Sequence, residues 1–171
     1  GELNPTSGQE NAHGQVGGFV VHDQFALVAM TRKNQILKID TQSGEITKTI
    51  PVNSPHGLAI DPFSGAVLVL SKDKLLSKKA SEDFITLIEN LEHPHGITLD
   101  QKGNIYISDH GQSHQVKVFS PKGKFLHAIG KAGPPSAGPY DPLHMNHPHG
   151  ITIDSRSQLW VTENDYLPKR V

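Results

Sequence analysis

The chain has 171 residues, of which 35% are hydrophobic, and 16 Lys and Arg against 17 Asp and Glu give a formal net charge of −1. This composition is that of an ordinary globular domain, and without a positive field a nucleic acid is not an expected partner. The longest apolar run, residues 25–30, is too short for a membrane span, so no membrane partner is expected, and zero cysteines exclude disulfides and thiolate metal sites.

The first predicted unit covers residues 17–52 and consists of short segments with alternating apolar residues. Residues 18–21 are predicted to form its first strand, because a period of two places successive side chains on opposite faces. Residues 35–44 align without a gap on residues 114–123 further along the chain. This alignment indicates that the first unit repeats the plan of the later ones.

The second unit, 53–91, opens with Pro-His-Gly at 55–57 and continues as a strand, a tight turn at 61–65 and a second strand at 66–70. Its outer half, 74–91, is ambiguous. The apolar positions there fit a helical stripe, but they also fit two strands. We expect strands, since the flanking repeats make this stretch the outer half of a four-stranded unit.

The third unit, 92–146, and the fourth, 147–171, open with the same Pro-His-Gly phrase at 94–96 and 148–150. The third unit has four predicted strands and then a stretch rich in glycine and proline, 130–140, which is predicted to be an irregular loop. Four antiparallel strands in about 40 residues is the plan of a propeller blade. The sequence therefore predicts an all-β fold, a β-propeller of four-stranded antiparallel blades, with about three and a half blades covered.

The repeated phrase places one histidine at the entry of each of three blades, His56, His95 and His149. The loop that enters each blade crosses the same face of a propeller, so the three imidazoles are predicted to meet at the mouth of the axial channel. Zinc takes imidazole nitrogens at about 2.0–2.1 Å, and a catalytic zinc has three protein ligands. The alternative is that each histidine only hydrogen-bonds the backbone of the neighbouring blade.

Other polar and aromatic residues are weaker candidates. His93 and His147 each lie two residues before the histidine of the phrase and are expected on the same face, and His144 lies in the inserted loop over that face.

Four further residues have two interpretations or a structural one. Asp109 and Glu163, which follow second strands, either bind a ligand or tie the hairpin to backbone N–H groups. His114, before the third strand of blade three, is expected to have a structural role. Trp160 is expected in the core.

The three phrases, together with residues 103–109, 114–119 and 121–125, resemble the NHL repeat. That resemblance implies that the sequence is part of a six-bladed propeller, with the remaining blades as its immediate partners. NHL propellers serve as binding platforms, extracytoplasmic bacterial modules or enzymes. The resemblance thus implies a small-molecule, peptide or protein ligand at the axial face and an extracellular or periplasmic location.

Among NHL enzymes the pattern resembles the peptidyl-α-hydroxyglycine amidating lyases, which hold an axial zinc through histidines in this slot. The resemblance implies His56, His95 and His149 as metal ligands, with Arg32, after the second strand of an early blade, as a catalytic residue. Tyr140 and Tyr166 are expected either to stack or donate a hydroxyl at the channel mouth or only to anchor loops, and Tyr166 is the second candidate catalytic residue. Two features differ from the lyase pattern: the histidines come from consecutive blades, and Gly111 stands where the lyases have a tyrosine. Two hypotheses follow, a ligand-binding propeller and a zinc-dependent lyase or hydrolase.

Overall fold

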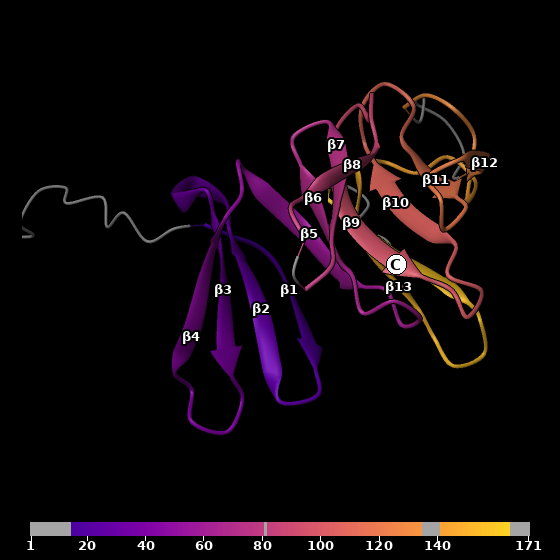
Figure 1. The fold of residues 1–171 in the computed structure, drawn as a ribbon. Helices are drawn as coiled ribbons and strands as arrows, with labels where there is room; N and C mark the ends of the chain where they lie inside the picture. Colours follow the sequence, from indigo (N-terminus) through magenta and orange to yellow (C-terminus); the bar gives the residue numbers. More distant parts are fainter. Residues whose placement is uncertain (1–14, 81, 135–140, 165–171) are drawn as a thin grey trace, which may run out of the picture.

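The computed structural model describes residues 15–80, 82–134 and 141–164, and their regular secondary structure is almost entirely β-strand (Figure 1). One short 3-10 turn, Thr31–Lys33, follows the second strand. None of the described residues belongs to a helix long and apolar enough to cross a bilayer.

Three four-stranded antiparallel sheets and one two-stranded sheet succeed one another along the chain. The sequence prediction of about three and a half propeller blades is therefore confirmed. In chain order the strands are β1 (Val16–His22), β2 (Phe25–Met30), β3 (Gln35–Asp40), β4 (Ile46–Pro51), β5 (Pro55–Ile60), β6 (Val67–Ser71), β7 (Lys74–Lys78), β8 (Ile85–Ile88), β9 (Pro94–Leu99), β10 (Ile105–Asp109), β11 (Gln115–Phe119), β12 (Phe125–Ile129), β13 (Pro148–Ile153) and β14 (Leu159–Glu163).

The ambiguous stretch 74–91 forms strands, as expected, and not a helix. β7 and β8 pair antiparallel, with Leu75 opposite Ile88. Both side chains are buried, in the same apolar cluster as Ile107 of the next blade. The strand conformation is favoured because it buries the apolar side chains of β7 and β8 against the next blade while their backbones stay hydrogen-bonded to neighbouring strands.

Aspartates start the turns between first and second strands, as the turn composition predicts. The carboxylate of Asp61 accepts the backbone N–H of Phe63 at 2.9 Å, and Asp100 accepts that of Lys102 at 2.8 Å. Asp154 repeats the contact with Arg156. These side chains replace a backbone acceptor and so close the tight turn.

The core lies between blades rather than within them. Leu27, Ala29 and Ile36 of the first blade pack against Leu58 and Val69 of the second. A second cluster joins blades two and three. The first strands β1, β5, β9 and β13 contact one another in sequence, so they form the inner row around the axis, as predicted.

Glycine is needed at the entries of β5 and β9 because the next blade is very close. A Cβ on Gly57 would lie 2.6 Å from the carbonyl oxygen of His95, and one on Gly96 would lie 2.5 Å from that of His149. A side chain at either position would thus collide with the backbone of the neighbouring blade.

The expectation that Trp160 belongs to the core is wrong. Its side chain is 44% exposed, and its indole N–H donates to Asp154 at 3.2 Å. The reason is strand alternation. Ile151 of the paired strand lies beside Gly96 of blade three, whereas Trp160 is on the opposite face of the sheet, which no described sheet covers.

Candidate binding site: a cluster of histidines

The three predicted histidines lie together, because each is the second residue of an inner strand and these strands are neighbours. The rings of His56 and His95 meet edge to face, with their centroids 6.1 Å apart. The rings of His95 and His149 are stacked at 4.2 Å. The repeat thus brings imidazoles that are 39 and 54 residues apart in the sequence to one end of the inner row.

Further histidines extend this group into a column of stacked rings, which we call the histidine stack. Its order is His149, His95, His110 and His93, with successive centroid separations of 4.2, 4.6 and 5.2 Å and interplanar angles of 28°, 23° and 22°. His56, His147 and His114 adjoin it, the last through a ring contact of 4.7 Å with His147. These seven residues are the histidine cluster.

His110 is the member that connects the others, and sequence reasoning did not single it out. It contacts His95, His93 and His147. The repeated phrase does not include it, since it follows a second strand. In a four-stranded blade the loop after the second strand lies on the same face as the loop that enters the first strand. That topological rule was the signal that could have identified it.

Burial and mutual proximity lower the pKa of three histidines of the cluster. Burial lowers the pKa of His95 to about 4, and the neighbouring His149 and His110 add to the effect. Burial also lowers the pKa of His56 and of His110, the latter with a contribution from His93. At neutral pH His95 therefore presents an uncharged ring with a free lone pair.

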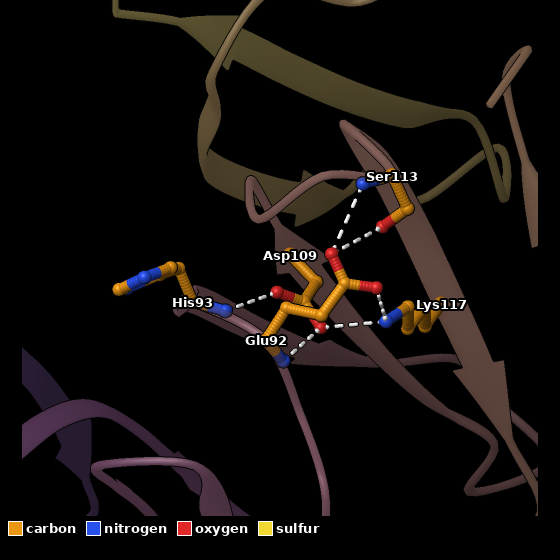
Figure 2. A network of polar contacts seen from close by, with 5 residues as sticks. All are labelled: Glu92, His93, Asp109, Ser113 and Lys117. Atoms are coloured by element: carbon orange, nitrogen blue, oxygen red, sulfur yellow. Dashed lines mark hydrogen bonds and ion pairs between the residues drawn. The ribbon is translucent and has the colours of Figure 1, made fainter. Parts of the chain in front are cut away.

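A buried ionic network fixes the backbone beneath the stack (Figure 2). The carboxylate of Asp109, which is fully buried, accepts the backbone N–H groups of Glu92 at 2.9 Å and His93 at 2.6 Å. The ammonium group of Lys117 bridges Asp109 and Glu92, at 2.9 Å from each. Asp109 thus ties the hairpin to backbone N–H groups, the structural alternative considered from the sequence.

Burial disfavours charge on both members of the Lys117–Glu92 pair, but their contacts outweigh it. Burial opposes the charge of Lys117, yet hydrogen bonds to Asp109 and Glu92 hold its pKa above the usual value. Burial likewise opposes the charge of Glu92, while Lys117 and Ser113 keep its pKa below the usual value. Lys117 and Glu92 are therefore both ionised at neutral pH.

An open pocket of about 560 Å³ adjoins the His93 end of the histidine stack, and we call it the histidine pocket. Its described lining consists of four imidazoles and a short loop, namely His93, His110, Gly111, Gln112, His114, Pro134 and His147. Gly111 packs directly on Glu92, because a Cβ there would lie 2.1 Å from the Cβ of Glu92. A tyrosine like that of the amidating lyases does not fit at this position.

His114 has the structural role expected of it. It is only 7% exposed, and its Nδ1 accepts the backbone N–H of His147 at 3.0 Å. Both residues have positive φ angles, 50° for His114 and 48° for His147. These conformations are uncommon for a side chain with a Cβ, and the hydrogen bond between the two residues helps to hold them.

The other described candidates, Arg32, His144 and Glu163, are not among the seven residues that define the histidine cluster. His144 pairs with Asp141 at 3.3 Å, and Arg32 is exposed in the turn Thr31–Lys33. Glu163 ends β14, opposite Pro148. Tyr166 lies outside the described residues, as does the other tyrosine considered for the channel mouth, Tyr140.

The arrangement of the rings bears on the zinc expectation. In residues 15–80, 82–134 and 141–164, no group of three or more His, Asp or Glu side chains is placed to hold one metal ion. The stack explains this, since His95 and His149 present their ring faces to each other and their nitrogens do not converge on one point. His56, His95 and His149 do not fit a three-histidine zinc site in this conformation.

Comparison with known proteins identifies the repeat. Residues 91–119 match the family model of the NHL repeat. NHL repeat-containing protein 2 of Bos taurus is 33% identical over 81 residues, which cover 45% of this chain and 11% of that protein. The chain contains an NHL repeat and folds as part of a β-propeller. Its sequence therefore spans only a small part of this curated relative.

Solved structures resemble this NHL-repeat propeller in fold. A virginiamycin B lyase from Staphylococcus aureus superposes with a TM-score of 0.67 at 21% identity, over 90% of this chain and 50% of that one. A chain of a nidogen–laminin complex superposes with a TM-score of 0.71 at 20% identity, over 86% of this chain and 56% of that one. Kuenenia stuttgartiensis hydrazine synthase superposes with a TM-score of 0.68 at 13% identity, over 98% of this chain and 47% of that one. The chain spans about half the length of these proteins, and at these identities the likeness concerns the fold alone.

Proposed function

We propose that this NHL-repeat propeller binds a ligand on the face that carries the histidine cluster. The observation that carries the proposal is the convergence of seven imidazoles from three blades beside an open pocket. Concave sites with a few convergent polar groups are the usual ligand sites of proteins. One neighbour in fold comes from a complex between two proteins, nidogen and laminin, which is consistent with a binding role for such a propeller.

The alternative is that the repeated histidines only hydrogen-bond the backbone of the neighbouring blade. Hydroxyl groups make such bonds between blades instead. The hydroxyl of Thr31 donates to the carbonyl oxygen of Pro55 at the entry of the second blade, at 2.7 Å. The hydroxyl of Ser108 donates to the carbonyl oxygen of His149 at the entry of the fourth. Because hydroxyls bind these two entry carbonyls, the imidazoles of His56 and His149 are not required for that purpose.

A fragment screen followed by NMR tests the proposal. The 13C-labelled chain is titrated with neutral, anionic and cationic fragments and with short peptides, and the imidazole signals are recorded. Fragments that bind are expected to shift signals of the histidine cluster and to leave His22 and His127 unchanged. His95→Ala is expected to weaken binding about tenfold, because a central ring is lost, whereas the exposed His127→Ala keeps it.

Two results would contradict a binding role for this face. One is that none of the fragments shifts the cluster signals. The other is that binding is confined to a different place, such as the smaller pocket of about 200 Å³ between blades two and three, which Asp61 and Lys79 help to line.

A zinc-dependent lyase or hydrolase is the second candidate, favoured by imidazole donors on three adjacent strands, among which His95 has a pKa of about 4. Zinc held by His56, His95 and His149 would supply Lewis-acid chemistry. Since the ring nitrogens of these histidines do not converge on one point, we derive no catalytic step through the metal. Arg32 and Tyr166 stay candidate catalytic residues of this second function.

Metal analysis and a zinc titration separate the two candidates. If zinc binds the native chain, a free concentration a hundred times the Kd stabilises it by about 2.7 kcal/mol, and His95→Ala abolishes the effect. Equal metal content in the wild type and His95→Ala would end the metal hypothesis. An α-hydroxyglycine peptide that the zinc-loaded chain leaves intact would end the lyase version.

A further inference from the structure

We infer that the histidine pocket takes a flat, uncharged aromatic ring, which stacks beyond His93 as one more layer of the histidine stack. This inference rests on the proposed function and specifies the chemical class of the ligand. It begins from the stack itself, in which four rings already follow one another at 4.2 to 5.2 Å with interplanar angles below 30°. Such a column is open to extension at an end whose ring face is exposed.

His93 is the end that meets this condition. It is an exposed residue, it lines the histidine pocket, and its ring points away from the Asp109–Lys117 network (Figure 2). The opposite end, His149, is also exposed but does not line that pocket. A ring that stacks on His93 would therefore be received by a concave surface, and one on His149 would not.

The lining indicates that the ring is uncharged. None of the described residues that line the histidine pocket is an Asp, Glu, Lys or Arg. The charged groups of Asp109, Glu92 and Lys117, which hold the backbone of His93 and the loop after β10, already pair with one another. Since an ionic ligand would find no fixed partner charge there, ring faces, the Pro134 ring and the amide of Gln112 are the recognition groups.

The walls of the pocket are fixed before any ligand arrives. The backbone N–H of His93 donates to Asp109 at 2.6 Å, that of Ser113 donates to Glu92 at 3.0 Å, and that of His147 donates to His114 at 3.0 Å. These bonds hold the segment before β9, the loop after β10 and the segment before β13. A pocket fixed in this way loses little conformational freedom on binding, which favours affinity for a rigid ring.

A matched pair of probes tests the inference on the whole chain. Benzamide and cyclohexanecarboxamide carry the same neutral amide, but only benzamide has a flat aromatic face. Benzamide is expected to bind about fivefold more tightly and to move the His93 and His110 ring signals upfield by its ring current. Equal affinity for the two probes, or upfield shifts confined to histidines outside the pocket, would overturn the inference.

Variants of His93 separate stacking from hydrogen bonding and from misfolding. His93→Phe retains a flat ring without ring nitrogens and is expected to keep the preference for benzamide, while His93→Ala is expected to lose it. His127→Ala, an exposed histidine on β12, is the control and should behave as the wild type. Loss of the preference in both His93 variants would contradict stacking. Because His93 is exposed, neither change removes a core side chain.

The outcome also distinguishes this inference from the proposed function. If fragments shift the cluster signals without preferring an aromatic ring, the axial face still binds ligands and only the ligand class is wrong. If no fragment of any kind shifts these signals, the proposed function itself fails, and the inference fails with it.

Discussion

His95 is the residue in which the geometry of the cluster has its largest chemical effect. Three other imidazoles contact its ring, and burial with these neighbours lowers its pKa from 6.5 to about 4. An isolated exposed histidine would be half protonated near pH 6.5. The low pKa is therefore a consequence of burial among the other imidazoles of the cluster.

The same shift predicts a pH dependence of stability. Below pH 6.5 the unfolded chain binds more protons at His95 than the folded chain, so stability falls as the pH drops from 6.5 toward 4. His56 and His110 shift in the same direction. We expect Tm to fall by about 5 °C between pH 7 and pH 5, measured by calorimetry. His95→Phe should flatten this dependence, and an unchanged slope in that variant would contradict the assignment.

Gly111 gives a second prediction at this scale. A Cβ on it would lie 2.1 Å from the Cβ of Glu92, which the ionic network holds in place. Gly111→Ala is expected to destabilise the chain by about 1–3 kcal/mol, measured by urea unfolding. At Gly150 the nearest atom to an added Cβ is the Thr162 hydroxyl at 2.9 Å, so Gly150→Ala should cost less. An equal loss in both variants would show that the loop is not packed as described.

Hairpin β10–β11 is the element that supports the cluster. Asp109 at the end of β10 and Lys117 in β11 form an ion pair whose carboxylate is fully buried, and Glu92 completes it from the segment before β9. Breaking such a pair leaves an uncompensated charge in the interior, which is far more costly than losing a surface pair. The hairpin therefore depends on all three residues.

Lys117→Met tests this dependence. The variant leaves the Asp109 carboxylate buried without its cation, and we expect a loss of about 3–5 kcal/mol in the free energy of unfolding. Lys74→Met removes an exposed pair with Glu89, where the side chains are 42% and 58% exposed, and should change stability little. Similar losses in the two variants would contradict a buried role for Lys117.

At the scale of the whole molecule, repetition is what made the fold predictable. The Pro-His-Gly phrase recurs three times, and it was sufficient to predict the blades, the inner row of strands and the meeting of His56, His95 and His149. It also decided between helix and strand in 74–91. These features follow from local pattern and from the topology of a blade, both of which are present in one sequence.

The parts that the sequence did not predict depend on contacts between segments. His110 lies outside the repeated phrase, and its ring partners come from blades three and four. Glu92 and Lys117 are 25 residues apart in the sequence, and no pattern marks them as a pair. Trp160 was expected in the core because the sequence shows that it belongs to a strand but not whether a neighbouring sheet covers its face.

The central claim, that the imidazoles of blades two, three and four form one contiguous cluster, is tested most directly by nuclear Overhauser effects between histidine rings. We expect cross-peaks between His56 and His95, between His95 and both His149 and His110, and between His110 and His93. Imidazole signals of His56, His95 and His149 that show no mutual cross-peaks, in a chain that is otherwise folded, would contradict it.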